Sequence, residues 1–460
     1  MATLTFLGAA TTVTGSKHLL DLDGRRVLFD CGLFQGLKEL RLRNWAPLPI
    51  PAADIEAVVL THAHLDHCGY LPRLVAQGFG GRIFCTPGTR ELCTLVLPDA
   101  ARIQEEDARD ANRHGYSKHQ PALPLYTEND AARALAQLQP VGYGRPVPVV
   151  PGLEVDFVNA GHLLGSAYAR ARVGRRTILF GGDLGRYSRP VLPDPSPIDS
   201  ADILLVESTY GDRLHDPDDG GQRLAAIVSA SVRRGGKLVI PSFAIGRVEE
   251  VLYWLKHLEE AGRIPVLPVY VDSPMAAAAL QFYSKRLSEL DPEMTPAERA
   301  VCAFGTGRMT IVASPQQSMD LVASRQPAIV IASSGMATGG RVLHHLEATL
   351  PNPKNTILFA GYQAIGTRGR QLVDGATEVR LKGRDIPVAA SIERIDSMSA
   401  HADAGEIMRW LSGFSHAPAM TYLVHGEPLP LEALRTKIAT KLSWPVHIAQ
   451  YLEQVTLDLG

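Results

Sequence analysis

Short apolar runs that end in a histidine, an aspartate or a glutamate recur along the first half of the chain. The run Ala57–Leu60 leads into the segment Thr61–His67, and comparable runs end beside Asp30, His162 and Asp183. Such runs are consistent with buried strands, and glycine beside several of them lets the backbone turn sharply. Because the strands of one sheet end side by side, we predict that these polar residues converge on one edge.

The strands predicted in this half of the chain are Thr3–Leu7, His18–Leu22, Arg26–Phe29, Arg82–Cys85, Glu154–Val158, Thr177–Phe180 and Asp202–Val206. Residues 89–140 are instead predicted to be mostly helical, with helices Ala100–Asn112 and Glu128–Leu138. Between these two helices lies the proline-containing loop 116–124. The sequence does not indicate the role of this loop.

From about residue 212 the pattern changes to alternating helices and strands. The helix Arg247–Ala261 has a clear apolar stripe and ends before Gly262, a residue typical of helix C-termini. A closing segment begins with the predicted strand Val388–Ile392 and contains helices Ala404–Leu411 and Leu431–Leu442. Alternation of this kind predicts an α/β fold with a mostly parallel sheet.

Composition restricts the class of protein. At 460 residues the chain is expected to form two domains or one domain with a large insertion. The net charge of −2 gives no global positive field, so a polyanion would have to be bound by local patches. The five cysteines include no C-x-x-C pair, and we find neither a signal peptide nor an apolar run that could span a bilayer. We therefore expect a cytoplasmic protein without a membrane partner.

The segment Thr61–His67 contains four potential metal ligands, which are His62, His64, Asp66 and His67. Neutral imidazole and carboxylate groups at this density suit zinc. A loop at the end of a strand allows all four to surround an ion, whereas one face of a regular strand or helix does not. The alternative is an ordinary solvated polar loop, which the polar residues downstream make a weaker interpretation.

If the strand ends converge, two ions are expected. One would bind His62, His64 and His162, and the other would bind Asp66, His67 and His425, with Asp183 bridging both. A dinuclear zinc centre of this kind activates water as a nucleophile. Asp30 would hold the segment Thr61–His67, called the histidine loop below, in place rather than bind zinc.

Zinc does not supply the proton that a leaving group needs, so a free acid is required. His401 and Glu207 remain once the ligands are assigned, and both lie in Gly- or Ser-rich segments near predicted strand ends. We expect His401 to be the general acid, oriented by Glu207, with Asp66 and Asp183 completing the catalytic set. The alternative for Glu207 is an ordinary pairing with a surface arginine.

These residues resemble known motifs. The chain resembles the metallo-β-lactamase superfamily in a signature that comprises His62, His64, Asp66, His67, His162 and Asp183. It resembles the β-CASP subgroup of nucleases at that subgroup's motifs A, B and C, which here are Glu207, His401 and His425. Within the subgroup it looks most like the bacterial and archaeal relatives of the endonuclease that cuts pre-mRNA before polyadenylation.

The resemblance implies an α/β fold: a four-layer αββα metallo-β-lactamase sandwich with an inserted α/β β-CASP domain that has a mostly parallel sheet. The lactamase domain would comprise residues 1–208 and 392–460, and the inserted domain residues 209–391. The resemblance also implies that His425 separates members that act on RNA from those that act on DNA, which carry valine there. Two departures are the absence of N-terminal KH-type modules and of the C-terminal extension of RNase J, which makes a processive exonuclease a weaker expectation.

Three loops of the predicted insertion follow strands and carry arginine, and two of them also carry serine. Helix N-termini and guanidinium groups favour phosphate, so we expect phosphate contacts from Ser242, Arg247, Ser334, Arg341, Arg368 and Arg370. Loops of this type are common, and only the set of three beside a hydrolytic centre favours a phosphodiester substrate.

These observations predict a zinc-dependent endoribonuclease that binds two Zn²⁺ and cleaves single-stranded RNA to leave 5′-phosphate and 3′-hydroxyl ends. The sequence does not decide whether 5′-exonuclease activity accompanies it, and it does not indicate a homo-oligomer. The alternatives are a DNA nuclease, another hydrolase of the superfamily, or a catalytically silent scaffold for RNA processing.

Overall fold

The computed structural model describes residues 2–115, 117–217, 219–295 and 304–459, so Cys302 lies outside the described residues. The chain divides into two compact units, of which the first comprises Met1–Leu214 with His401–Gly460 and the second comprises His215–Ala400. The second unit is therefore inserted into the first. The predicted domain bounds, at 208/209 and 391/392, lie a few residues earlier at each junction and stay a prediction.

The first unit contains two seven-stranded sheets. Sheet one has the order β22-β1-β2-β3-β4-β5-β6, and its strands, in chain order, are β1 (Ala2–Phe6), β2 (His18–Leu22), β3 (Arg25–Phe29), β4 (Ile55–Val59), β5 (Arg82–Cys85), β6 (Leu138–Pro140) and β22 (Gln454–Leu457). Sheet two has the order β21-β20-β11-β10-β9-β8-β7, and its strands are β7 (Val147–Val150), β8 (Leu153–Asn159), β9 (Ala167–Val173), β10 (Arg176–Phe180), β11 (Ile203–Glu207), β20 (Met420–Val424) and β21 (Val446–Ile448).

The two sheets pack face to face around one hydrophobic core. Phe29 of β3 and Phe180 of β10 stack across it with ring centroids 3.6 Å apart, and buried aliphatic residues from both sheets surround them. The helices of this unit are α1 (Lys38–Arg43), η1 (Ala52–Asp54), α2 (Leu65–Cys68), α3 (Leu71–Ala76), α4 (Pro87–His114), α5 (Glu128–Ala136), α13 (Ala404–Leu411) and α14 (Pro428–Lys441).

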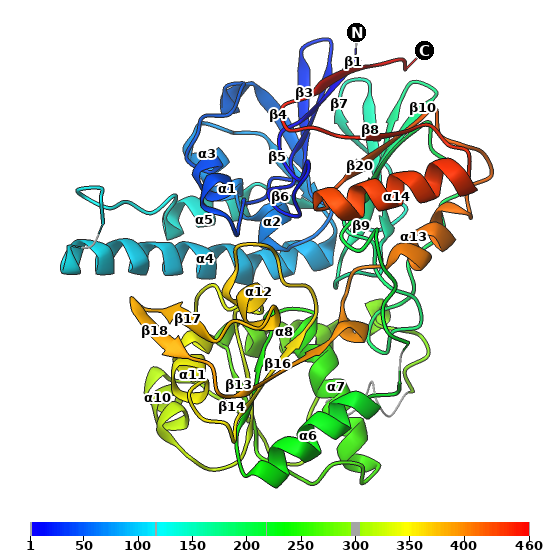
Figure 1. Cartoon of the computed structure of the whole chain (residues 1–460). Helices are drawn as coiled ribbons and strands as arrows, with labels where there is room; N and C mark the ends of the chain where they lie inside the picture. The colour runs from blue at the N-terminus through cyan, green and yellow to red at the C-terminus, as the bar shows by residue number, and fades with distance from the viewer. Residues whose placement is uncertain (1, 116, 218, 296–303, 460) are drawn as a thin grey trace. The chain divides into compact units, whose positions relative to one another are not determined.

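Helices form the outer layers of this unit (Figure 1). A second core joins sheet two to α13 and α14 through Trp410, Leu411, Leu434 and Ile438, while α3 and α4 each pack against α5 beside sheet one. The predicted four-layer αββα sandwich is confirmed. Burying apolar surface in this way contributes roughly 25 cal/mol per Å², so these two cores stabilise the edge on which the polar strand ends lie.

The second unit is an α/β domain with a six-stranded sheet in the order β14-β13-β15-β12-β16-β19, all of whose pairs are parallel. Its strands are β12 (Leu238–Pro241), β13 (Val269–Asp272), β14 (Met309–Ile311), β15 (Ile329–Ala332), β16 (Thr356–Ala360) and β19 (Ser391–Ile395), and β17 (Glu378–Leu381) with β18 (Arg384–Pro387) form a separate hairpin. Its helices are α6 (Gln222–Arg234), α7 (Arg247–Glu260), α8 (Pro274–Lys285), η2 (Leu287–Glu289), α10 (Pro315–Ala323), α11 (Val342–Thr349), α12 (Arg368–Val373) and η3 (Asp396–Met398). The predicted inserted domain with a mostly parallel sheet is confirmed.

Two predicted elements differ from the structure. The helix expected at Ala100–Asn112 is the second half of α4, a helix of 28 residues that begins after the capping residue Thr86 and runs through Pro98. Proline inside a helix costs about 3 kcal/mol, but the buried stripe that includes Leu92, Val96 and Leu97 lies on the same helix and offsets that cost. The strand expected at Val388–Ile392 begins at Ser391 and pairs with β16, so it belongs to the second unit.

No helix among the described residues is long and apolar enough to cross a membrane.

Candidate metal centre

The histidine loop follows β4 and continues into α2. Thr61 and His62 leave the strand, His64 immediately precedes the short helix, and Asp66 and His67 lie on it. Backbone hydrogen bonds anchor this turn, because the Ser16 N–H donates to the Asp66 carbonyl at 2.8 Å and the Cys31 N–H donates to the His67 carbonyl at 2.7 Å. The loop is therefore held by the chain that follows β1 and by the chain that follows β3.

Gly32 is required for this close approach. A Cβ atom at position 32 would lie 1.6 Å from the Asp66 carbonyl oxygen and 2.0 Å from its carbonyl carbon. Both contacts are to backbone, which cannot move aside as the end of a side chain can. The glycine thus allows the β3 end to lie against α2.

Asp30 orients the loop by three hydrogen bonds. Its carboxylate accepts from the Thr61 N–H at 2.8 Å, from the Thr61 hydroxyl at 2.9 Å and from Nδ1 of His67 at 2.8 Å. Donation from Nδ1 leaves the lone pair of His67 on Nε2. Asp30 itself has the left-handed φ of 57° at the end of β3, which turns its side chain toward the loop. This is the arrangement expected of a residue that positions a ligand.

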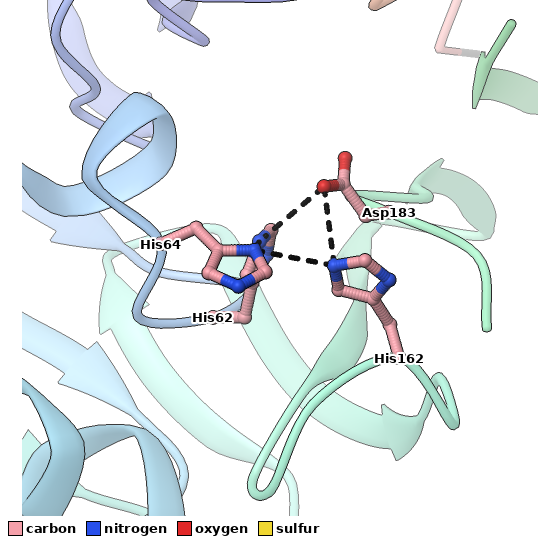
Figure 2. Close-up of side chains that lie close together, drawn as sticks. All are labelled: His62, His64, His162 and Asp183. Carbon is pink, nitrogen blue, oxygen red and sulfur yellow. Dashed lines mark hydrogen bonds and ion pairs between the residues drawn. The ribbon is translucent and has the colours of Figure 1, made fainter. Parts of the chain in front are cut away.

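One group of converging atoms comprises His62, His64, His162 and Asp183 (Figure 2). Nδ1 of His64 lies 3.1 Å from Nε2 of His62 and 3.2 Å from Nε2 of His162. Oδ2 of Asp183 lies 3.4 Å from Nε2 of His62 and 3.5 Å from Nε2 of His162. The four ligand atoms therefore come from the histidine loop, the end of β8 and the end of β10.

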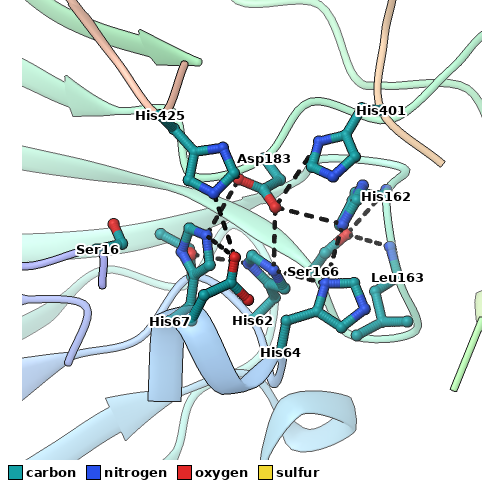
Figure 3. A network of polar contacts seen from close by, with 12 residues as sticks. Ser16, His62, His64, His67, His162, Leu163, Ser166, Asp183, His401 and His425 are labelled. Carbon is teal, nitrogen blue, oxygen red and sulfur yellow. Dashed lines mark hydrogen bonds and ion pairs between the residues drawn. The ribbon is translucent and has the colours of Figure 1, made fainter. Parts of the chain in front are cut away.

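A second group comprises Asp66, His67 and His425. Oδ2 of Asp66 lies 3.3 Å from Nε2 of His425 and 3.9 Å from Nε2 of His67. The other oxygen of Asp183, Oδ1, lies 3.1 Å from Nε2 of His67. The two oxygens of Asp183 thus face the two groups separately, as Figure 3 shows.

The spacing of these nitrogen and oxygen atoms suits the ligands of a metal ion better than it suits hydrogen bonds between them. Ligands at about 2.1 Å in a tetrahedron lie about 3.4 Å apart, and the four distances given for the first group are 3.1 to 3.5 Å. Nε2 of His67 and both oxygens of Asp183 are buried and make no hydrogen bond among the described residues. Buried polar atoms are normally satisfied, so a cation between these atoms accounts for their arrangement.

Burial keeps the imidazoles of His62, His64 and His162 in the form that binds metal, whereas at His67 the carboxylates of Asp183 and Asp30 outweigh burial and raise the pKa. Burial lowers the pKa of His64 to about 3, with His62 as a further cause, and it lowers the pKa of His62 and His162. Neutral imidazole is the ligand form. Burial opposes ionisation of Asp183, but the neighbouring His425 and His67 hold the pKa of that carboxyl well below its usual range.

Glu207 and His401 lie beside these groups. Nδ1 of His401 is 3.0 Å from Oε2 and 3.1 Å from Oε1 of Glu207, and it is 3.9 Å from Oδ2 of Asp183. Glu207 ends β11, is 1% exposed, and accepts a hydrogen bond from the Leu184 N–H at 2.7 Å. The predicted pairing of His401 with Glu207 is therefore present in the structure, and Glu207 has no surface-arginine partner among the described ion pairs.

Thr209 also belongs to the site, although the sequence did not identify it. Its hydroxyl donates a short hydrogen bond to Glu207 and lies 3.1 Å from Nδ1 of His425. Because a hydroxyl has one proton, Nδ1 of His425 is the donor of the second bond, which leaves the lone pair on Nε2, facing Asp66. The signal available in the sequence was its position two residues after Glu207.

The predicted phosphate-binding residues all lie in the second unit, and the arginines have partners within it. Arg247 pairs with Glu250, Arg341 with Asp272, and Arg370 with Asp374. Arg368 donates to the carbonyls of Ala337, Thr338 and Arg380. Of the serines, Ser334 caps the N–H groups of Thr338 and Gly339, whereas the buried hydroxyl of Ser242 makes no hydrogen bond among the described residues. Their role toward phosphate stays a prediction.

Comparison with known families agrees with this geometry. Residues 25–220 match a beta-lactamase superfamily domain, residues 248–372 match a Beta-Casp domain, and residues 385–449 match a Zn-dependent metallo-hydrolase RNA specificity domain. The Beta-Casp model matches the middle of the chain, between the matches of the other two family models, as expected for an inserted domain.

Curated relatives cover most of the chain. It is 37% identical over 450 residues to ribonuclease TTHA0252 of Thermus thermophilus, covering 97% of this chain and 98% of the relative. It is 30% identical over 437 residues to transcription termination factor FttA of Methanocaldococcus jannaschii, covering 92% and 67% respectively. An RNase J-like protein of the same archaeon is 30% identical over 435 residues, with 93% of each chain covered.

A solved structure shows the same fold over nearly all of the chain. It is the crystal structure of a protein of unknown function from Enterococcus faecalis, with a TM-score of 0.54, 14% sequence identity, and 99% and 100% of the two chains covered. The fold and the clustered histidines and aspartates define a metal-dependent hydrolase of the metallo-β-lactamase superfamily. Within that superfamily the chain belongs to the β-CASP family, as the sequence motifs predicted.

Proposed function

We propose that this chain is a zinc-dependent endoribonuclease that hydrolyses single-stranded RNA and leaves 5′-phosphate and 3′-hydroxyl ends. The observation that carries the proposal is the pair of ligand groups that share Asp183, with His401 and Glu207 beside them. The choice of RNA is supported by the relative named as a ribonuclease and by the RNA specificity domain that matches residues 385–449.

Two Zn²⁺ ions are the proposed cofactors. His62, His64 and His162 would hold one ion, Asp66, His67 and His425 would hold the other, and each oxygen of Asp183 would serve one ion. When bound, zinc lowers the pKa of water and neutralises charge on a phosphate. Nitrogen and carboxylate donors without thiolates suit zinc among the common divalent ions.

His401 would protonate the leaving oxygen. Burial lowers its pKa, but the carboxylates of Glu207 and Asp183 outweigh burial and raise that pKa to about 9. The imidazole is then protonated at neutral pH, with Nδ1–H directed at Glu207. In the proposed step a water molecule gives up one proton to solvent as its oxygen bonds to phosphorus, the bond from phosphorus to the 3′-oxygen breaks, and His401 donates its proton to that 3′-oxygen and then regains one from solvent. The products are a 3′-hydroxyl and a 5′-phosphate.

We place this activity in a reducing compartment such as the cytoplasm. All four cysteines among the described residues are buried free thiols, which are Cys31, Cys68, Cys85 and Cys93. An oxidising compartment favours disulfides.

The test compares matched single-stranded RNA and DNA oligonucleotides with the purified full-length chain. We expect two zinc ions per chain by elemental analysis, cleavage of RNA alone, and products that accept a 5′-label only after phosphatase treatment. His401→Ala should retain zinc and lower kcat by about 10²- to 10⁴-fold. Equal cleavage of DNA would overturn the choice of substrate, and an unchanged kcat in His401→Ala would overturn the role of the acid.

A further inference from the structure

A pocket outside the metal centre lies in the first unit, next to α1. Its lining includes Lys17, Phe34, Tyr70, Arg43 and Tyr451, and it holds about 300 Å³ of space not filled by atoms, open solvent included. Two cations and three aromatic rings therefore share one small site. The candidate catalytic residues have no part in this lining.

Lys17 forms the floor of the pocket. Its side chain is 2% exposed, and its ammonium lies 4.6 Å from the ring centroid of Phe34 and 4.8 Å from that of Tyr70. The ammonium donates to the Gly15 carbonyl at 3.3 Å, and no carboxylate pairs with it among the described residues. Burial lowers the pKa of Lys17 to about 8, so an anion in the pocket would restore the stability of its charged form.

Arg43 forms one side of the pocket. Its guanidinium carbon lies over the ring of Tyr451, 3.9 Å from the ring centroid, and 5.5 Å from the centroid of Phe34. Within the part of the chain that the structure describes, Arg43 has no ion-pair partner, and neither have Lys38 and Arg41 on the same helix. A guanidinium that lies over an aromatic ring without a carboxylate partner keeps N–H groups available for phosphate.

Exposed apolar side chains accompany the pocket: Leu452 lines it, and Leu42 and Trp45 are the chain neighbours of the lining residues Arg43 and Ala46. Leu42 is 57% exposed, Trp45 48% and Leu452 50%, and α1 has no buried residue. Arg73 lies 5.7 Å from the ring of Trp45. Exposed aromatic rings with cations beside them are the usual construction of a surface that binds single-stranded nucleic acid, because bases stack on the rings while the cations contact the backbone.

We propose that this α1 surface, formed by Lys17, Arg43, Trp45, Tyr451 and Leu452, is a second binding site for single-stranded RNA. A base would stack on Trp45, and a phosphate would contact Arg43 above the positive floor formed by Lys17. The inference rests on the proposed function, since it takes RNA as the substrate. The unpaired cations favour RNA over an apolar protein partner, which would leave them buried without counter-charges.

The α1 surface is built by the same segments that support the histidine loop. Lys17 follows Ser16, whose N–H donates to the Asp66 carbonyl, and the Tyr70 N–H, just beyond α2, donates to the Cys31 carbonyl at 2.8 Å. RNA held at this surface is therefore bound within the same compact unit as the metal centre. Its contribution should appear in the binding of substrate rather than in the chemical step.

The first test measures binding of a labelled 20-nucleotide single-stranded RNA to the full-length chain carrying His401→Ala, by fluorescence anisotropy at several salt concentrations. Trp45→Ala should weaken binding about five- to a hundredfold, and Trp45→Phe should restore it, because one stacked base is lost and then regained. Arg43→Gln should reduce the slope of log K against log salt by about 0.7, the effect of one phosphate contact with a single strand. Arg175→Gln, at an exposed arginine in the turn between β9 and β10, is the matched control and should change neither value.

The second test measures cleavage with His401 intact. Trp45→Ala should raise KM for the same RNA about five- to a hundredfold and leave kcat unchanged. If the unmodified chain cleaves no RNA, the proposed function fails. If it cleaves RNA and the Trp45 and Arg43 variants keep both KM and the salt slope, only the α1 surface is refuted. A variant that alters the association of the chain with itself but not RNA binding would identify a second copy as the occupant and would also refute it.

Discussion

The hydroxyl of Thr209 lies 3.1 Å from Nδ1 of His425, and the hydroxyl of Thr61 lies 3.1 Å from Nδ1 of His62. In each case the same hydroxyl donates to a carboxylate, that of Glu207 or Asp30. Each threonine hydroxyl oxygen therefore accepts a hydrogen bond from Nδ1–H of the histidine. This leaves the lone pair of that histidine on Nε2, which faces the candidate metal centre. Two segments far apart in the chain use one arrangement to set the tautomer of a ligand.

Thr209→Val should lower activity through this arrangement. The substitution retains the shape of the side chain but leaves His425 without its acceptor and Glu207 without one donor. We expect kcat or zinc affinity to fall about 10- to 100-fold, the usual cost of losing a group that orients a metal ligand. Thr209→Ser retains the hydroxyl and should keep both within about threefold of the unmodified chain. Equal losses in the two variants would show that the hydroxyl alone does not account for the role of Thr209.

Asp30→Asn should weaken zinc binding. An amide accepts through one oxygen only, so the three hydrogen bonds to Thr61 and His67 cannot all persist. Competition with a chromogenic chelator should show zinc affinity about 10- to 100-fold lower. Asp156→Asn is the matched control, because Asp156 is equally buried but pairs with Arg170. It should lower stability without changing zinc affinity, and a similar loss of zinc in both variants would contradict the assigned role of Asp30.

Gly32→Ala should displace the histidine loop. The added methyl group would overlap the Asp66 carbonyl, 1.6 Å away, and Asp66 and His67 would have to shift with α2. Overpacking in a close-packed region costs about 1–3 kcal/mol or more, so we expect a lower Tm together with loss of zinc. Gly80→Ala is the control, since a Cβ at that position meets no atom within 4 Å. Normal zinc content in purified Gly32→Ala would show that the loop can bind metal without this contact.

The sequence predicted the convergence of the site because its residues stand at strand ends. His62, His162 and Asp183 follow β4, β8 and β10, and His425 follows β20. Strands of one sandwich end along a common edge, so a linear pattern was enough to bring these residues together. The same pattern led to the proposal of how these residues would be shared between two ions, and the family resemblance agrees with it.

Other features depend on contacts that no linear pattern reports. The carboxylate that pairs with Arg341 is that of Asp272, 69 residues earlier in the chain. The sequence alone therefore gave no sign that the guanidinium of Arg341 has an ion-pair partner. Thr61 and Thr209 were passed over because a hydroxyl beside a ligand has no periodic signal. The course of α4 through Pro98 follows from a buried stripe, whose energy is set by tertiary packing.

Glu249→Gln should stabilise the second unit as pH rises. Glu249 is fully buried in the first turn of α7, and burial raises its pKa from 4.5 to about 8, against smaller opposing contributions from backbone groups and Arg247. Between these two pH values the folded chain holds a proton that the unfolded chain has lost. The free energy of unfolding therefore falls by about 1.4 kcal/mol per pH unit as pH rises from about 4.5 to about 8, and above that range the loss caused by Glu249 is complete and no longer changes with pH.

Because glutamine does not titrate, the free energy of unfolding of the variant should lack this pH dependence. The variant should therefore become increasingly more stable than the unmodified chain as pH rises from 5 to 8. Urea unfolding at these two pH values measures the difference. Glu260→Gln, on the same helix with its side chain 63% exposed, should follow the unmodified chain. Parallel pH profiles for Glu249→Gln and the unmodified chain would mean that Glu249 is ionised in the folded protein, and that its charge is compensated within the second unit.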